Sequence, residues 1–212
     1  RMDELIDVCT NWNLNIIEDA AESLGSFYKS KHTGTLGTLG TLSFNGNKTI
    51  TTGGGGMVLA DQKLGDKIKH LSTTAKIPHE YEFYHDEIGY NYRLPNINAA
   101  LGCAQLENLP EFLKKKRELA KIYKDFFKNK GYKFFEEPED CISNYWLNTI
   151  ICDSKSHREN LLQITNDNKI MTRPIWKLMS SLPMYKKCIT DELKNSIWLE
   201  ERIVNLPSSV KI

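Results

Sequence analysis

The sequence predicts an α/β fold with a smaller α+β domain at its C-terminal end. An apolar strand that ends in acidic residues is typical of the parallel sheet of an α/β fold. From Gly131 onward the pattern changes to short strands around one helix, which is typical of a small α+β unit. The 212 residues, 40% of them hydrophobic, are enough for one large or two modest domains. We place the domains at residues 1–110 and 111–212.

The first half begins with an amphipathic helix. Leu5, Ile6 and Cys9 fall on one helical face, so a helix is predicted over residues 2–13. A threefold Gly-Thr-Leu repeat over residues 34–42 is too short for a fibrous repeat and indicates a loop that runs into a strand. The other elements predicted in this half are a strand at 14–17, a strand through Leu42 and Phe44, a strand at 57–60 and a helix at 62–73.

The second half begins with a polar and aromatic stretch, residues 76–92, which predicts a long loop of the kind that carries function. Pro95 marks the start of a helix, and Pro110 is expected to interrupt it before a second helix at 111–128. The basic run at 114–117 is expected on a solvated face, because the chain is charge-balanced. Further predicted elements are strands within 132–135, 145–152 and 169–176 and a tail helix at 191–201.

Charge and cysteine content narrow the function classes. A formal net charge of +1 removes the electrostatic argument for binding nucleic acid or a membrane surface, so the expected partner is a small molecule or a protein. Five scattered cysteines without a C-x-x-C pair, and five histidines without metal-ligand spacing, predict no metal site. Without a membrane-length apolar run or a leader pattern, we expect a cytoplasmic protein.

Lys48 is the residue with the most specific chemistry. It follows Ser43 and Phe44 and precedes a run of four glycines, so its amine can form an imine with a carbonyl cofactor while hydroxyl and N–H groups hold an anion. A surface lysine beside a hairpin turn explains the motif about equally well. A nucleotide-binding P-loop does not, because that motif requires glycine before the lysine and Asn47 stands there.

Asp19, at the end of the first predicted strand, suits a pyridine cofactor. An ionised carboxylate that faces the ring nitrogen keeps it protonated, so that the ring accepts electrons from a carbanion. A helix N-cap is the alternative role for this aspartate. Asp19 and Lys48 together are more informative than either residue alone.

Three segments carry a resemblance to a known family. They are Glu-Asp-Ala-Ala-Glu-Ser-Leu-Gly at 18–25, Ser-Phe-Asn-Gly-Asn-Lys and the glycines at 43–56, and Gly-Tyr-Asn-Tyr-Arg-Leu-Pro-Asn at 89–96 with the small residues that follow. Weaker matches lie at 172–176, 182–185 and 206–209. The chain resembles the DegT/DnrJ/EryC1/StrS sugar aminotransferases. This resemblance implies part of the large domain of the PLP-dependent transferase fold (aspartate aminotransferase-like, type I) and a smaller α+β C-terminal domain.

The resemblance also implies the site residues. Lys48 would form the internal aldimine with pyridoxal 5'-phosphate (PLP) and move the proton, and Asp19 would pair with the pyridine nitrogen. Ser43 would bind the cofactor phosphate, and Glu22 stands where many members carry glutamine near the ring hydroxyl. Asn91 would reach the phosphate in the partner subunit's site, which implies a homodimer with shared active sites.

The activity that the resemblance implies is amino transfer from glutamate to a nucleotide-linked 4-keto-6-deoxy sugar, in the biosynthesis of bacterial cell-surface polysaccharide or glycan. Residues 91–105 are most similar to members that serve sugars of the bacillosamine and legionaminic acid type. A related branch of PLP-dependent sugar dehydratases carries histidine in place of Lys48. Because the chain starts at Arg1 and lacks the upstream part of the large domain, we expect a C-terminal portion, and an inactive or regulatory fragment is the remaining alternative.

Overall fold

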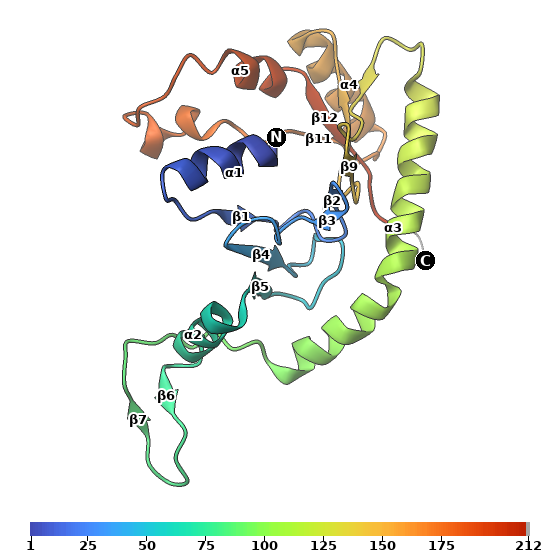
Figure 1. Ribbon diagram of the computed structural model, residues 1–212. Coiled ribbons are helices and arrows are strands. Elements are labelled where there is room, and N and C mark those ends of the chain that lie inside the picture. Colours follow the sequence, from blue (N-terminus) through green and yellow to red (C-terminus); the bar gives the residue numbers. More distant parts are fainter. Residues whose placement is uncertain (211–212) are drawn as a thin grey trace. The chain divides into compact units, whose positions relative to one another are not determined.

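The computed structural model describes residues 1–210 (Figure 1). The chain divides into two compact units. Unit 1 comprises Arg1–Leu113 and Pro138–Asn144, and unit 2 comprises Lys114–Glu137 and the chain from Tyr145 onward. The short segment Pro138–Asn144 therefore returns to unit 1 between two stretches of unit 2. The domains at 1–110 and 111–212 remain a prediction, since compact units need not coincide with domains, and the last two residues lie outside the described part.

The main sheet of unit 1 has the strand order β1-β4-β5. Strand β1 (Ile17–Asp19) is parallel to β4 (Leu39–Ser43), and β5 (Gly56–Ala60) is antiparallel to β4. The predicted strand at 14–17 was placed too early, because the acidic residues lie within β1 and do not merely follow it. Two predicted helices are confirmed: α1 (Met2–Asn11) and α2 (Gln62–Ser72), the latter capped by the Asp61 carboxylate.

Unit 1 contains two further small sheets. Strands β2 (Phe27–Tyr28) and β3 (Lys31–His32) form a hairpin, and β9 (Cys141–Ile142) pairs antiparallel with β2. The region predicted as a long loop, 76–92, contains a hairpin of β6 (Lys76–Ile77) and β7 (Tyr84–His85). These strands have two residues each, too few to show an alternating hydrophobic pattern.

The core of unit 1 is formed by residues of β4, of the loop that follows β4 and of the turn after β1. Its buried members are Ala20, Leu42, Phe44 and Ile50. Phe44 and Ile50 flank Lys48 in sequence, so the lysine loop is anchored in the core on both sides. Partly buried Leu24, Leu59, Leu109 and Phe112 pack against this cluster.

Helix α3 (Asn96–Phe127) is a single helix of 32 residues, so the predicted interruption at Pro110 was wrong. A proline inside a helix removes one backbone hydrogen bond and costs about 3 kcal/mol. Here Leu109 and Phe112, on either side of the proline, pack against the core of unit 1. Burial of these side chains offsets the cost, and the helix continues.

Unit 2 is built on an antiparallel sheet with the order β11-β12-β10-β8. Its buried core includes Phe134, Ile150, Cys152 and Val204. Strand β12 follows the tail helix and was not predicted, although all four of its residues are buried. The elements of this unit are β8 (Lys133–Phe134), β10 (Asn148–Ile151), α4 (Lys155–Asp167), β11 (Arg173–Pro174), the 3-10 turns η1 (Met179–Ser181) and η2 (Pro183–Tyr185), α5 (Lys194–Glu200) and β12 (Ile203–Leu206).

Candidate active site

Three of the predicted site residues gather at one edge of the main sheet. Asp19 is the last residue of β1, Ser43 is the last residue of β4, and the loop 44–55 with Lys48 follows directly. Because β1 and β4 are parallel, both strands end at the same edge, where α/β sheets bind their ligands. The register confirms this, since Asp19 lies opposite Thr41, two residues before Ser43.

The loop that carries Lys48 is closed by hydrogen bonds at its base. The Phe44 amide donates to the Gly55 carbonyl at 2.9 Å, and the Thr52 amide donates to the Phe44 carbonyl at 3.0 Å. Thr52 is 1% exposed, and its carbonyl accepts a hydrogen bond from the Asn98 side chain of α3. The loop is thus fixed to both the sheet and a helix.

Lys48 itself is largely covered. Its side chain is 12% exposed, and its Nζ forms an ion pair with the Glu22 carboxylate, which is itself 44% exposed. The structure therefore brings together two of the predicted site residues that are 26 positions apart in sequence. A surface lysine on a hairpin turn would have a free, solvated side chain, which is not what the structure shows.

The remaining predicted residues have more local contacts. Asp19 is exposed, and its Oδ1 accepts a hydrogen bond of 3.2 Å from the Ala21 amide. Ser43 is half-buried, and its Oγ accepts from the Asn45 amide at 3.4 Å. Asn91 is exposed and forms a β-bridge with Thr73. The functions of these residues remain predictions.

Glu18, in the middle of β1, has a structural role that the sequence did not reveal. Its carboxylate accepts three backbone hydrogen bonds, from Gly34 at 2.7 Å, Leu36 at 2.5 Å and Gly37 at 2.6 Å. Three N–H donors on one carboxylate hold the Gly-Thr-Leu loop against β1. The repeat was the available signal, because closely spaced glycines offer backbone amides to an anion.

One glycine of the repeat is required by close approach of the chain. A Cβ atom added to Gly40, in β4, would lie 2.1 Å from the carbonyl oxygen of Gly34. No side chain fits at that distance, so glycine allows the loop to cross β4.

Asn144 is the second residue that sequence reasoning missed. It is 4% exposed and belongs to the segment that returns to unit 1. Its Nδ2 donates to the carbonyls of Glu22 at 2.8 Å and Leu24 at 3.0 Å and lies 3.3 Å from Thr49 Oγ1. A single sequence gives no signal for contacts over 95 to 122 positions.

Lys116 corrects the expectation for the basic run. It is 5% exposed, whereas the run was expected on a solvated face. Its ammonium group donates to the carbonyls of Ser208 at 2.9 Å, Trp146 at 3.3 Å and Tyr145 at 3.4 Å. Burial lowers the pKa of Lys116 from 10.5 to about 8. This lysine is a structural element of unit 2.

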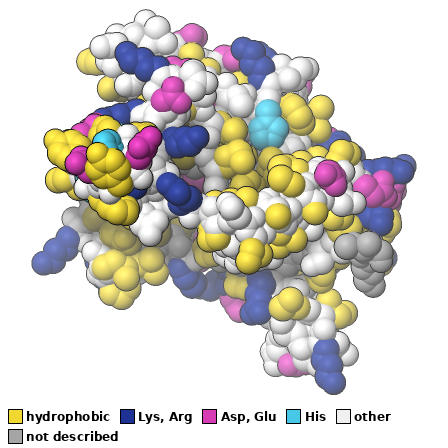
Figure 2. Space-filling view, turned by 90° about the horizontal axis from the view of Figure 1, so that it is seen from below, with side chains coloured by type: hydrophobic (Ala, Val, Ile, Leu, Met, Phe, Trp, Pro, Cys, Tyr) yellow, Lys and Arg dark blue, Asp and Glu magenta, His cyan; other side chains and the backbone are white. Residues whose placement is uncertain are grey.

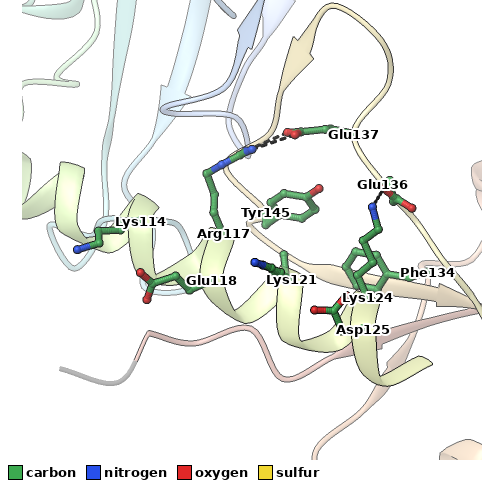
Figure 3. A pocket seen from close by; sticks show the side chains of 11 residues that line it. Lys114, Arg117, Glu118, Lys121, Lys124, Asp125, Phe134, Glu136, Glu137 and Tyr145 are labelled. Atoms are coloured by element: carbon green, nitrogen blue, oxygen red, sulfur yellow. Dashed lines mark hydrogen bonds and ion pairs between the residues drawn. The ribbon is translucent and has the colours of Figure 1, made fainter. Parts of the chain in front are cut away.

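Unit 2 also contains an open cavity of about 600 Å³ beside the second half of α3 (Figure 3). The guanidinium group of Arg117 forms a bidentate ion pair with the Glu137 carboxylate, with both N–O distances at 2.9 Å. Lys124 Nζ pairs with Glu136 Oε2 at 2.5 Å. The cavity is lined by four cations, Lys114, Arg117, Lys121 and Lys124, and by four carboxylates, Glu118, Asp125, Glu136 and Glu137. The lining thus carries equal numbers of positive and negative side chains.

A histidine and two carboxylates lie close together in unit 1. The possible ligand atoms of His70, Asp86 and Glu87 are all within 4.8 Å of one another. His70 Nε2 lies 2.7 Å from Asp86 Oδ1, and this hydrogen bond lowers the pKa of Asp86. Lys67 forms an ion pair with Glu87. The group is thus occupied by its own ion pairs, and a cation would have to displace Lys67.

The chain belongs to the DegT/DnrJ/EryC1/StrS aminotransferase family, whose model matches residues 1–212. It is 41% identical to the GDP-perosamine synthase of Escherichia coli O157:H7 over 213 residues, which cover 98% of this chain and 56% of that protein. It is 37% identical to the GDP-perosamine synthase of Vibrio cholerae, again covering 56% of that protein. The chain thus spans little more than half the length of these relatives.

Solved structures agree with the family. The Helicobacter pylori PseC aminotransferase, involved in the biosynthesis of pseudoaminic acid, superposes with a TM-score of 0.91 at 25% identity. The match covers 98% of this chain and 57% of PseC. This similarity, together with the family match, confirms the predicted α/β aminotransferase fold. Within residues 1–210, no helix combines the length and the apolar character that crossing a membrane requires.

Proposed function

We propose that this chain carries the reactive lysine of a PLP-dependent sugar aminotransferase. The observation that carries the proposal is the placement of Lys48, whose 12% exposed side chain lies on a closed loop at the edge where β1 and β4 end. Membership of the aminotransferase family supports it. The amino group moves from an amino acid, which we propose to be glutamate, to a nucleotide-linked 4-keto-6-deoxy sugar used for bacterial cell-surface polysaccharide or glycan.

Each site residue has a distinct role in this proposal. Lys48 Nζ would hold the cofactor covalently at its aldehyde carbon, with release of the aldehyde oxygen as water, and would move a proton at the substrate carbon. Asp19, an exposed carboxylate at the strand end, would accept a hydrogen bond from the ring nitrogen and keep it protonated. Ser43 would donate to the phosphate, and Glu22 would be near the ring hydroxyl. When bound, PLP supplies the conjugated ring that accepts an electron pair from the substrate.

The chemistry of these side chains suits the cofactor. PLP needs an amine, a carboxylate for the ring nitrogen and hydroxyl or N–H donors for the phosphate, and one sheet edge offers all three. The ion pair with Glu22, three residues after the end of β1, supports a position of the Lys48 amine near this edge. Release of Glu22 would free the amine for the aldehyde.

A homodimer with shared active sites is part of the proposal. Asn91 of one subunit would contact the phosphate bound by its partner. The hairpin beside Asn91 exposes large aromatic side chains, with Tyr81 at 77%, Phe83 at 82% and Tyr84 at 63% exposure. In the view of Figure 2, hydrophobic side chains also lie at the surface among charged ones. Exposed aromatic groups of this kind are covered when a second chain binds.

The relatives favour a GDP-linked acceptor. The GDP-perosamine synthase of E. coli O157:H7 matches 98% of this chain, whereas the UDP-4-amino-4,6-dideoxy-N-acetyl-beta-L-altrosamine transaminase of Campylobacter jejuni matches 61%, at the similar identity of 40%. We therefore propose a GDP-linked keto sugar, with a UDP-linked N-acetylated sugar as the competing substrate. Both belong in the same assay, with glutamate as donor and formation of 2-oxoglutarate as the measurement.

We propose the cytoplasm as the compartment. All five cysteines are free, although Cys103 and Cys188 are exposed and accessible to oxidation. Exposed free thiols persist where glutathione keeps them reduced.

The role of Lys48 is tested by trapping the cofactor. The chain is saturated with PLP, reduced with borohydride and digested, and the peptides are mapped by mass spectrometry. We expect the pyridoxyl group on Lys48. The Lys48→Arg variant keeps the charge but cannot form the imine, so it should lose this adduct. Lys63→Arg, at an exposed position on α2, is the matched control and should keep it.

The outcome is decided by where the adduct lies. A pyridoxyl group spread over several lysines in equal amounts in the wild type and in Lys48→Arg would contradict the proposal. An adduct on Lys48 without amino transfer to either sugar would support the lysine assignment and reject the proposed substrates for this chain.

A further inference from the structure

Asn144 joins two loops that are remote in sequence. Its side-chain amide has two hydrogens, and the two shortest contacts of Nδ2 are to the carbonyls of Glu22 and Leu24. The same nitrogen lies 3.3 Å from Thr49 Oγ1, on the lysine loop. The Asn144 backbone amide also donates to Ser26 Oγ at 3.0 Å. One residue thus contacts the segment 22–26 at three points and the lysine loop at one.

Each of the two loops contains a residue that pairs with Lys48 or adjoins it in sequence. Glu22, whose carbonyl accepts from Asn144, is also the residue whose carboxylate pairs with Lys48 Nζ. Thr49 is the next residue after Lys48. Asn144 therefore contacts the backbone of the residue that pairs with Lys48 and the side chain of the residue that follows Lys48, through a single buried group.

The segment that carries Asn144 is itself fixed. Its strand β9 pairs with β2, and the Lys29 amide donates to the Asp140 carbonyl at 2.8 Å. These bonds locate the segment independently of Asn144. The Asn144 side chain, 4% exposed, is thus presented to the two loops from a third, separately anchored piece of chain.

We propose that Asn144 is a positioning residue that holds the Lys48 amine in place through Glu22 and Thr49. The proposed role is to position other groups, and it includes no contact with cofactor or substrate. This role rests on the proposed function of Lys48 as the reacting amine. The contacts themselves are present without cofactor, so the positioning can be measured on the cofactor-free chain.

The test compares three variants of the 212-residue chain. Asn144→Asp keeps the shape of the side chain but replaces the donor by an acceptor, which repels the carbonyls of Glu22 and Leu24. Thr49→Val removes only the contact of Asn144 with the lysine loop and preserves the volume of the side chain at position 49. Asn148→Asp is the matched control, because Asn148 is a fully buried amide of unit 2 whose Nδ2 donates to Ser208 Oγ.

Two readouts are taken without cofactor. Mass spectrometry follows the rate of reductive methylation of Lys48, normalised to the exposed Lys63, and hydrogen exchange follows the peptides covering residues 20–26 and 44–52. We expect Asn144→Asp to raise the Lys48 rate by about 2- to 10-fold, the ratio that corresponds to loss of one net hydrogen bond. Thr49→Val should raise it less, and Asn148→Asp should leave it unchanged.

Three results would overturn the proposal. The first is an unchanged Lys48 rate in folded Asn144→Asp. The second is an unchanged rate in Thr49→Val if Asn144→Asp does not fold. The third is an equal increase in Asn148→Asp, which would indicate general loosening. If PLP trapping on Lys48 fails while the methylation rates behave as expected, the positioning stands and the cofactor assignment alone is rejected.

Discussion

The ammonium group of Lys48 and the carboxylate of Glu22 form an ion pair in the cofactor-free chain. The lysine side chain is covered and the glutamate is half-exposed, so the pair lies at the border between protein and solvent. The Glu22 carboxylate is therefore paired with the amine that the proposed reaction requires. Access of any electrophile to Lys48 depends on opening this pair.

The first prediction concerns Glu22→Gln. Without the carboxylate, the Lys48 amine loses an ion pair of the partly exposed kind, which is worth about 0.2 to 1 kcal/mol. We expect Lys48 to be methylated about 1.4 to 5 times faster than in the wild type, as measured by peptide mass spectrometry. Glu87→Gln is the control, since it breaks the Lys67 pair and should accelerate Lys67 only. Equal acceleration of Lys48 in both variants would contradict the prediction.

The second prediction concerns Glu18→Ala. The variant leaves the amides of Gly34, Leu36 and Gly37 without their acceptor. Hydrogen bonds to a charged group are worth about 1.5 to 3 kcal/mol each, but water reaches part of the loop. We expect the free energy of unfolding in urea to fall by about 2 to 4 kcal/mol. Glu80→Ala, at an exposed site, should change it by less than about 0.5 kcal/mol.

The third prediction concerns the pH dependence that Lys116 creates. Burial lowers its pKa to about 8, so between pH 8 and 10.5 the unfolded chain holds a proton that the folded chain releases. The contribution of this lysine to the free energy of unfolding therefore rises with pH across that window and is lowest below pH 8. We expect the wild type to gain about 1 to 2 kcal/mol relative to Lys116→Met between about pH 7.5 and 9.5.

Urea denaturation at the two pH values measures this gain. Lys121→Met, an exposed position on the same helix, should follow the wild type at both pH values. A constant difference between wild type and Lys116→Met would show that Lys116 keeps its proton throughout.

The fourth prediction concerns Cys152. Burial raises the pKa of its thiol to about 11, so only about one molecule in a thousand carries the thiolate at about pH 8. We expect iodoacetamide to modify the exposed Cys103 and Cys188 first and to reach Cys152 only when the chain unfolds in urea. Modification of Cys152 at the rate of Cys188 in the native chain would show that unit 2 opens readily.

The sequence predicted elements with a long, regular period better than short ones. Helices α1 and α2 are confirmed because an apolar face repeats over several turns. Strand β1 was shifted because Glu18 was expected to end it, whereas its carboxylate is satisfied by backbone amides inside the fold. The hairpin β6–β7 was not predicted, because its strands of two residues each are too short for an alternating hydrophobic pattern in the sequence.

The positions of the predicted site residues could be predicted where local chain order determines them, while their functions stay predictions. Parallel strands place Asp19 and Ser43 at one edge, and the loop between β4 and β5 brings Lys48 there as well. The contacts of Asn144 and Lys116 depend on chain segments that meet only in the folded protein. Hydrophobic periodicity carries no information on contacts between segments that are remote in sequence. For the same reason, the sequence cannot distinguish the buried Lys116 from the other lysines in the run at 114–117.

The return of Pro138–Asn144 to unit 1 makes that unit discontinuous along the chain. A ribosome that has extended the chain only as far as Leu113 has not yet supplied strand β9 or Asn144. Unit 1 therefore completes its hydrogen bonding only after the 24 residues 114–137 of unit 2, and then its own segment Pro138–Asn144, have been added. Maturation of the lysine loop is in this way coupled to synthesis of the other unit, and a split of the chain at Leu113 would yield two pieces that each lack part of unit 1.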